Sequence, residues 1–155
     1  MTETSSIQRT LVVFKPDAVQ RGIVGELLAR FEHRGLRIAA MRALKVEGAM
    51  AEKHYAVHKG KFFFDDLVKL ITASPVVAAV LEGPHAISVV RAMVGATRPH
   101  EAAPGTIRGD YALTIGRNVI HGSDSPETAK KEIGLFFRRD ELIEYARVDE
   151  TWLRE

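Results

Sequence analysis

The sequence predicts an α+β fold, in which four antiparallel strands and the helices between them form a βαββαβ sandwich with helices on one face of the sheet. Two observations predict it. Strand-like and helix-like segments alternate along the chain in that order, and the chain's 155 residues, 46% of them hydrophobic, suit one core. No repeat or linker divides the chain. We therefore expect one domain over residues 1–155, with residues 1–7 flexible and residues 138–155 as a C-terminal extension.

The first half of the chain predicts a strand, a helix and a second strand. Residues 10–14 (TLVVF) are β-branched or aromatic, and Pro16 ends this strand because proline cannot donate to a sheet. Residues 22–35 carry apolar side chains at helical spacing, and Gly35 is a typical helix stop. Residues 36–46 alternate in part and predict the second strand.

The middle of the chain is predicted as two helices, a strand and a helix, over residues 49–58, 63–74, 76–81 and 86–95. Residues 96–117 have little apolar periodicity, so they predict a long loop. Residues 111–115 (YALTI) are a weak strand candidate within it. Long loops of this kind are often functional.

The last predicted strand is residues 118–120 (NVI), and a helix follows it. Ser125 is a suitable N-cap, and Pro126 is typical of the first helical position. The apolar face of this helix is predicted to consist of Ala129, Ile133, Phe136 and Phe137.

Composition excludes several classes of protein. The 22 basic and 20 acidic residues give a formal charge of +2 with no long basic tract, so nucleic acid or an anionic membrane is not the expected partner. The absence of cysteine excludes disulfides, zinc–thiolate and iron–sulfur sites and cysteine nucleophiles. The N-terminal residues do not resemble a signal peptide, and the longest apolar stretch is too short for a membrane span. We expect a soluble cytoplasmic protein.

His121 is the first candidate for chemistry, because it stands where the last strand gives way to the polar turn GSDS. Imidazole is a competent nucleophile when an acceptor holds its other nitrogen. Glu132 on the following helix is a candidate acceptor, and Gly122 is expected to leave room for a substrate. The alternatives are a histidine that only hydrogen-bonds a loop and a solvated Glu132 beside Lys131.

Positive charge near this histidine comes from arginine alone. Between Lys69 and Lys130 there is no lysine, and the basic residues of that stretch are Arg91, Arg98, Arg108 and Arg117. Guanidinium groups match phosphate oxygens in geometry and stay charged, although each can also be an ordinary surface residue. Thr97 can add a hydroxyl, and Lys15 at the end of the first strand either reaches solvent or enters a ligand crevice.

The stretch HYAVHKGKFFFDD carries histidines and aromatic residues. His54 and His58 stand four residues apart, but no HExxH pattern or third ligand accompanies them, so a zinc site is disfavoured. Three consecutive phenylalanines (62–64) cannot all face one core, so one is expected to stack on a flat ligand. Because the chain has neither GxxxxGK[ST] nor GxGxxG, side chains must hold the phosphates of any nucleotide.

Together these stretches resemble the nucleoside diphosphate kinase family. FKPDAVQRG, HYAVH, RAMVGAT, PGTIRGDYA and NVIHGSDSPETAKKEIGLFF occur in this order and at the family's spacings. The resemblance implies a ferredoxin-like βαββαβ domain and a ping-pong reaction. A nucleoside triphosphate would phosphorylate His121 on its δ nitrogen, and the phosphohistidine would pass its phosphoryl group to a nucleoside diphosphate.

The resemblance also implies a role for each site residue. Glu132 and Ser123 would support the ring of His121. Phe63 would stack on the base, with Leu67 and Ile115 on its other side, and Asn118 would contact the ribose. The implied phosphate and sugar contacts are Lys15, Tyr55, Arg91, Thr97 and Arg108. Stacking reads a π-face that every base has, so broad use of ribo- and deoxyribonucleotides is expected.

The remaining implications concern the metal, the assembly and the alternatives. Mg²⁺ would be held mainly by the nucleotide phosphates, with no direct protein ligand. A homo-oligomer is expected, a hexamer in preference to a tetramer, with residues 138–155 at a subunit interface. Two alternatives are a phosphohistidine carrier that serves other proteins and a ferredoxin-like nucleic-acid-binding module. The second would need the paired aromatics of a KGFGFVxF strand, which TLVVF and VVAAVL lack.

Overall fold

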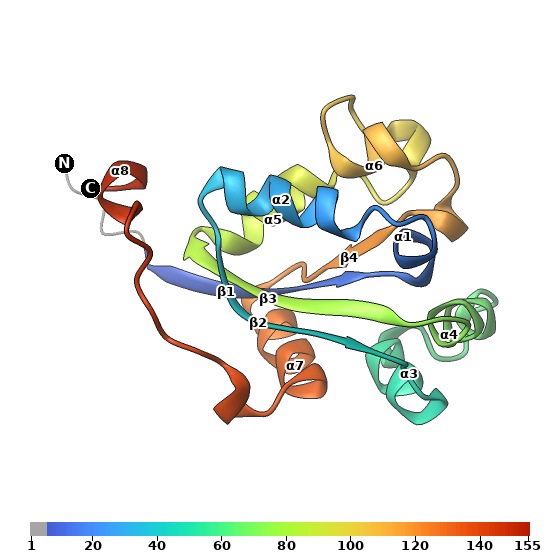
Figure 1. Cartoon of the computed structure of the whole chain (residues 1–155). Helices are drawn as coiled ribbons and strands as arrows, with labels where there is room; N and C mark the ends of the chain where they lie inside the picture. Colours follow the sequence, from blue (N-terminus) through green and yellow to red (C-terminus); the bar gives the residue numbers. More distant parts are fainter. Residues whose placement is uncertain (1–5) are drawn as a thin grey trace.

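A computed structural model describes residues 6–155 and contains one antiparallel sheet of four strands (Figure 1). The strands are β1 (Ile7–Phe14), β2 (Arg37–Leu44), β3 (Val76–Pro84) and β4 (Ile120–Gly122), in the spatial order β2-β3-β1-β4. β1 and β3 pair along their whole lengths at the centre, while β4 is a short edge strand that pairs only with the end of β1. The predicted strand order along the chain is confirmed.

Helices cover both faces of the sheet, so the expectation of helices on one face is wrong. α2 (Val24–Arg34) and α5 (Ala86–Val94) pack on one face, while α3 (Gly48–His54) and α7 (Pro126–Phe136) lie on the other (Figure 1). The reason lies in the central strands, which are apolar on both sides. In β1, Val12 and Phe14 belong to the first core and Leu11 and Val13 to the second, and all four are fully buried.

The segments between the strands differ in detail from prediction. Pro16 ends β1 but also starts a short unpredicted helix, α1 (Pro16–Gln20). The helix predicted over residues 49–58 is α3 followed by the 3₁₀ turn η1 (Ala56–His58). The next predicted helix is α4 (Phe64–Thr72).

The strand candidate over residues 111–115 is wrong. That region contains the 3₁₀ turn η2 (Pro99–Glu101), the helix α6 (Ile107–Tyr111) and the 3₁₀ turn η3 (Ile115–Arg117). α6 starts at Thr106, whose hydroxyl accepts the N–H of Gly109 at 3.0 Å. This N-cap is a local signal that competes with the β-branched composition of YALTI.

Two predicted helix ends are confirmed. Ser125 caps α7 by accepting the N–H of Thr128, with Pro126 at the first position, and the predicted apolar face of α7 is buried. Gly35 ends α2 with φ of 102°, a left-handed conformation that favours glycine.

The C-terminal residues return along the outer edge of β2 (Figure 1). They include the 3₁₀ turn η4 (Arg139–Glu141) and the helix α8 (Glu150–Leu153). Ile143 donates its N–H to the carbonyl of Ala39 at 2.8 Å, and Tyr145 donates its hydroxyl to the carbonyl of Ile38 at 2.7 Å. The flexibility predicted for residues 1–7 concerns mainly residues outside those described, and β1 already begins at Ile7. Over residues 6–155, no helix has the length and apolar character needed to cross a membrane.

Candidate active site

The imidazole of His121 lies on the edge strand β4, where both helical layers can reach it. His121 pairs with Val13 of β1, so its side chain lies on the same face as α3 and α7. The next residue, Gly122, faces the opposite layer, and a Cβ there would lie 3.4 Å from the side chain of Val90 in α5. Gly122 lines the cleft that opens over His121, and the absence of a side chain also lets α5 pack close to β4.

A cleft of about 1380 Å³ opens over this histidine. Its walls come from the end of β1, the α3–α4 region, α5, the segment from Thr97 to Asn118, β4 and α7. Eleven of the twelve predicted site residues line it: Lys15, Tyr55, Phe63, Leu67, Arg91, Thr97, Arg108, Ile115, Asn118, His121 and Glu132. Ser123, the twelfth, is fully buried behind Glu132.

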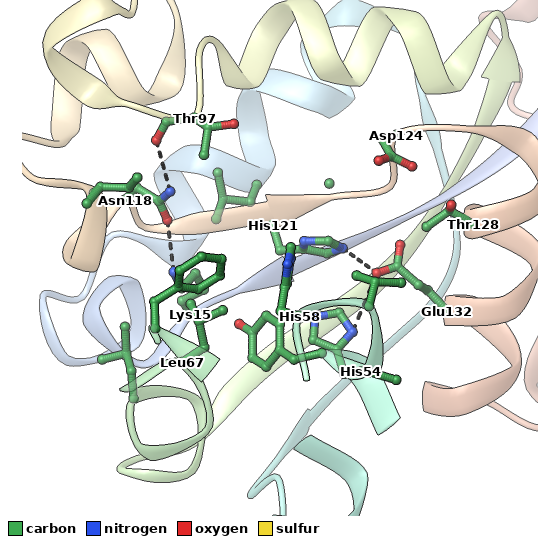
Figure 2. Close-up of a pocket in the computed structure, with 18 of the residues that line it drawn as sticks. Lys15, His54, His58, Leu67, Thr97, Asn118, His121, Asp124, Thr128 and Glu132 are labelled. Atoms are coloured by element: carbon green, nitrogen blue, oxygen red, sulfur yellow. Dashed lines mark hydrogen bonds and ion pairs between the residues drawn. The ribbon is translucent and has the colours of Figure 1, made fainter. Parts of the chain in front are cut away.

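A carboxylate and a hydroxyl hold the imidazole from behind. The Nε2 atom of His121 lies 2.6 Å from Oε2 of Glu132 (Figure 2), and Oε1 of Glu132 accepts the hydroxyl of Ser123 at 2.7 Å. Burial alone would raise the pKa of Glu132, but the hydrogen bond and charge of His121 and the hydroxyl of Ser123 outweigh it and lower that pKa. Glu132 is thus an ionised acceptor. Since it occupies Nε2, the free ring nitrogen of His121 is Nδ1, on a side chain that is 28% exposed.

A strained turn precedes β4 and was not predicted. Val119 has φ of 62°, which is unusual for a β-branched residue, and Ile120 donates its N–H to the carbonyl of Asn118 at 2.8 Å. Two outside contacts hold this γ-turn. Val119 donates its N–H to Oδ2 of Asp17 at 3.0 Å and accepts the N–H of Lys15 at 2.9 Å. Conformations of this kind cost about 1–3 kcal/mol and persist only where the surroundings impose them.

Lys15 and Asn118 form a buried polar pair at one side of the cleft. The Nζ of Lys15 donates to Oδ1 of Asn118 at 2.8 Å, and Nδ2 of Asn118 donates to the carbonyl of Thr97 at 3.1 Å (Figure 2). Burial lowers the pKa of Lys15 to about 8, despite the opposing effect of Asp17. The ammonium group is thus held in place but poorly stabilised.

Arg108 is buried among backbone carbonyls. It is 4% exposed, and it donates from Nε to Asn118 at 3.2 Å, from Nη1 to Gly95 at 3.2 Å and from Nη2 to Ile120 at 2.6 Å. Burial, with a smaller effect from the charge of Arg91, lowers the pKa of Arg108 to about 10. A guanidinium carries five N–H groups, so two remain for a ligand.

The other three arginines of the lysine-free stretch differ in their positions. Arg91 on α5 lines the cleft and donates to the carbonyl of Gly122 at 3.4 Å. Arg117 also lines the cleft but is exposed. Arg98 does not line it and lies 3.9 Å from Glu101 at the surface. Positive charge therefore collects at the cleft from three of the four predicted arginines.

Glycines allow α6 and the end of α5 to approach closely. Gly95 has φ of 88°, and a Cβ there would lie 2.5 Å from Oγ1 of Thr106. A Cβ at Gly109 would overlap the carbonyl of Ala103. These contacts place Arg108 against the end of β4.

The far end of the cleft is apolar and more open. Phe63 and Leu67 line it from the α4 side, and Ile115, 57% exposed, lines it from η3. Phe62 is 95% exposed outside the cleft, while Phe64 packs against the core. Of the three consecutive phenylalanines, it is Phe63 that faces the cleft.

Tyr55 and His54 lie between this apolar end and the imidazole. Burial, with a smaller contribution from Glu132, raises the pKa of Tyr55 to about 12, so its hydroxyl keeps its proton. His54 packs edge-on against His121, with ring centroids 4.7 Å apart, and its Nδ1 lies 3.5 Å from Oε2 of Glu132. His58 lies beside Tyr55 and Phe63 instead, so the spacing of four does not bring the two histidines to one site.

Comparison with known proteins identifies the family. A family model described as nucleoside diphosphate kinase matches residues 8–142. The nucleoside diphosphate kinase of Thermomicrobium roseum is 58% identical over 147 residues, which are 95% of this chain and 99% of that protein. The enzyme of Archaeoglobus fulgidus is 56% identical over 149 residues, 96% of this chain and 99% of that one. The chain belongs to the nucleoside diphosphate kinase family.

Solved structures of nucleoside diphosphate kinases agree with the fold. The enzyme of Halobacterium salinarum in complex with CDP has a TM-score of 0.94 at 45% identity and covers 97% of this chain and 100% of its own. A transition-state mimic of the Borrelia burgdorferi enzyme with vanadate and ADP has a TM-score of 0.89 at 38% identity, with 94% and 96% covered. The predicted ferredoxin-like fold, kinase function and phosphotransferase class are confirmed. The carrier and nucleic-acid-binding alternatives are not.

Two residues of the nucleoside diphosphate kinase site were not predicted from the sequence. One acts by holding the backbone, and the other is buried behind the imidazole. The Asp17 carboxylate holds the turn at Val119, and His54 is packed between His121 and Glu132. Asp17 stands in the FKPD motif and His54 in the HYAVH motif. The only local signal for Asp17 is an acidic residue two positions after Lys15. This spacing does not reveal that the carboxylate bonds to Val119, which lies about a hundred residues away.

Proposed function

We propose that Nδ1 of His121 attacks the terminal phosphorus of a nucleoside triphosphate and then returns the phosphoryl group to a nucleoside diphosphate. The single observation that carries this proposal is the 2.6 Å contact between Nε2 of His121 and Glu132. It puts the proton of the neutral ring on Nε2 and leaves the Nδ1 lone pair free. As Nδ1 bonds to phosphorus the ring gains positive charge, and the Glu132 carboxylate stabilises it.

The charge displaced in this step would be taken up by Lys15, Arg91 and Arg108. Phosphoryl transfer through a loose transition state needs positioning and positive charge more than covalent assistance. Among residues 6–155, none of these three cations forms an ion pair with a carboxylate, and all three line one cleft. Lys15 and Arg108 have lowered pKa values because burial leaves their charges poorly compensated. A polyphosphate supplies the missing negative charge.

The nucleoside would bind with its base at the apolar end of the cleft. We assign the stacking face to Phe63, with Leu67 and Ile115 lining the other side of the base. Asn118 and Lys15 would hold the sugar, while Tyr55 and Thr97 would add hydroxyl contacts to the sugar and phosphates. The three residues assigned to the base are apolar and offer no side-chain donor or acceptor to its edge. We therefore expect broad base specificity, for ribo- and deoxyribonucleotides alike.

Mg²⁺ would arrive with the nucleotide. It prefers oxygen ligands in an octahedral arrangement, and when bound it neutralises phosphate charge. Of the carboxylates that line the cleft, Glu132 contacts His121 and Ser123, while Asp66, Asp124 and Glu127 lie elsewhere along its walls. We propose a magnesium ion held mainly by phosphate oxygens, with no direct protein ligand.

We further propose a homo-oligomer, a hexamer in preference to a tetramer. Residues 138–155 pack along their own chain but leave Val148 and Trp152 strongly exposed, which suits contact with a neighbouring subunit. Size-exclusion chromatography with light scattering tests this assembly. We also propose a location in the cytoplasm, for which cell fractionation is the test.

The experiment that tests the function is labelling with γ-³²P-ATP and Mg²⁺. The wild-type chain is expected to carry an acid-labile, base-stable label that GDP discharges as GTP, whereas His121→Ala carries none. His100→Gln, which replaces an exposed histidine outside the cleft, is the matched control and keeps the label. Persistent labelling of His121→Ala would contradict the proposal, as would a label that GDP does not remove.

A further inference from the structure

His54 is the buried group that the proposed reaction leaves unexplained. Its side chain is fully buried, and neither ring nitrogen has a hydrogen-bond partner within the described part of the chain. An unpartnered buried imidazole costs free energy, so it calls for a reason. Nδ1 of His54 faces a carboxylate oxygen of Glu132, and its ring packs edge-on against that of His121.

Three residues with metal-ligating atoms come together at the Nε2 side of the reactive imidazole, and His121 itself is one of them. Nδ1 of His54 lies 3.5 Å from Oε2 of Glu132, Nε2 of His121 lies 2.6 Å from the same oxygen, and one ligand atom from each residue falls within 4.8 Å of the others (Figure 2). Imidazole nitrogens and carboxylate oxygens are both ligands of divalent transition metals.

We propose that His54, His121 and Glu132 form an inhibitory binding site for a nitrogen-preferring divalent cation such as Zn²⁺. Two histidines and a glutamate are a set of three protein ligands that zinc accepts, with a fourth position left for water. Mg²⁺ is not the expected occupant, because it prefers oxygen ligands. All three residues line the cleft, so an ion can enter from the nucleotide side.

The two distances to Glu132 suit zinc after a small adjustment. Zn–N and Zn–O bonds of about 2.0–2.2 Å place tetrahedral ligand atoms about 3.3–3.6 Å apart. The 3.5 Å between His54 and Glu132 already fits this range, while the 2.6 Å between His121 and Glu132 must open by less than about 1 Å as the ion replaces the shared proton.

Inhibition follows from the proton balance of the His121 ring. A neutral imidazole carries one proton, which Glu132 holds on Nε2 when no metal is bound. Coordination of Zn²⁺ to the Nε2 lone pair displaces that proton, and the neutral ring then carries its proton on Nδ1. No net proton is gained or lost. The nitrogen that should attack phosphorus no longer has a free lone pair.

Direct binding of Zn²⁺ to the full, nucleotide-free chain tests the site without any assay of activity. By isothermal titration calorimetry, wild type is expected to bind one equivalent per chain, and His54→Gln to bind at least ~100-fold more weakly because a ligand is lost. The matched control is His100→Gln, since His100 also lies beside a carboxylate, 3.8 Å from Glu101, but at the surface. This variant should bind as wild type does. Equal binding by wild type and His54→Gln would overturn the proposal.

A second measurement covers the case in which the His54 variant does not fold. On the wild-type chain, Zn²⁺ is expected to shift the NMR signals of the His54 and His121 rings and to leave that of His100 unchanged. Shifts confined to exposed histidines would overturn the proposal.

The inhibition arm rests on the proposed function. Zn²⁺ in the presence of excess Mg²⁺ should slow the labelling of wild type by ATP by at least ~10-fold, a chelator should restore it, and folded His54→Gln should resist Zn²⁺. Equal inhibition of wild type and His54→Gln would contradict the site. If wild type takes no label even without Zn²⁺, the proposed function fails, while the calorimetry and NMR still decide the metal site.

Discussion

The two ends of the cleft are built differently. At the phosphate end, Lys15, Arg108 and Glu132 are buried. Lys15 is held by its hydrogen bond to Asn118, Arg108 by three backbone carbonyls, and Glu132 by His121 and Ser123. At the base end, Phe63 and Ile115 are partly or largely exposed and make apolar contacts. Hydrogen bonds in a buried site fix positions to fractions of an ångström, whereas apolar contact tolerates variation in shape.

This difference separates chemistry from recognition. The reaction needs one geometry for every nucleotide, so the strained turn at Val119 and the carbonyls around Arg108 hold the phosphate end rigidly. The base needs only a surface of suitable width. We therefore expect changes at the phosphate end to lower kcat steeply and changes at the base end to raise KM modestly.

The largest expected effect comes from Arg108→Ala. This change removes charge from the transition state and releases the backbone at Asn118 and Ile120, so kcat/KM should fall by about 10³-fold or more. Thermal unfolding should also occur at a lower temperature, because two buried carbonyls and one partly buried carbonyl lose their donor. Steady-state phosphotransfer and calorimetric melting measure the two effects.

Arg98→Ala is the matched control for this change. Arg98 lies in the same lysine-free stretch but outside the cleft, with Glu101 as a neighbour at 3.9 Å, so both rate and stability should stay near wild type. If Arg108→Ala retained the rate within about 10-fold, the assignment of displaced charge to Arg108 would be wrong.

Glu132→Gln is expected to lower the rate of His121 labelling by about 10²-fold. Glutamine keeps the size of the side chain, but its amide can donate to Nε2 and so favours the tautomer with the proton on Nδ1. Rapid-quench measurement of a single turnover reports this step directly. An unchanged labelling rate would show that the carboxylate does not set the tautomer.

Raising the pH should weaken nucleotide binding through Lys15. The pKa of Lys15 is lowered to about 8 by burial, so kcat/KM should fall by about fivefold between pH 8 and pH 9 if the ammonium form binds phosphate. A bound nucleotide favours the charged form and raises this pKa, so kcat should hold to higher pH than kcat/KM. The Lys15→Arg variant should lose this transition. A transition that remains in Lys15→Arg would assign it to another group.

The same group should have the opposite effect on folding stability. The unfolded chain keeps the proton of Lys15 up to its ordinary pKa of 10.5, while the folded chain releases it near 8. Between these values the unfolded state binds more protons, so the contribution of Lys15 to the free energy of unfolding rises with pH. Measuring kcat/KM and the free energy of unfolding over the same pH range tests this. If activity falls while the chain does not lose stability, the cause is weaker nucleotide binding and not alkaline unfolding.

Much of the phosphate end could be predicted from the sequence, because its residues lie within recognisable motifs. His121, Glu132, Arg108 and Lys15 stand in or beside NVIHGSDS and PGTIRGD and FKPD, and the structure brings them into one cleft. What could not be predicted are contacts whose partners are about a hundred residues apart. The hydrogen bond from Val119 to Asp17 is one example, because nothing local to either residue indicates it.

The fold errors have local causes as well. The continuous apolar run of β1 implies that helices cover both faces of the sheet. A strand with only one covered face would show alternating apolar and polar residues. The prediction of a strand at 111–115 followed β-branched composition, whereas the N-cap of Thr106 determined a helix just before it.

The smallest expected effect comes from the base end. Phe63→Ala should raise KM by about 5-fold, the effect of about 1 kcal/mol of stacking on a partly exposed ring, and should leave kcat nearly unchanged. The increase should be similar for adenine, guanine, cytosine and uracil nucleotides, because each base offers the same kind of face. Phe62→Ala is the matched control, since that ring is 95% exposed outside the cleft and should affect neither constant. A larger change in Phe62→Ala than in Phe63→Ala would move the stacking surface to Phe62. A large fall in kcat for Phe63→Ala would mean that the base end also positions the reacting phosphate, and the separation between the two ends would not hold.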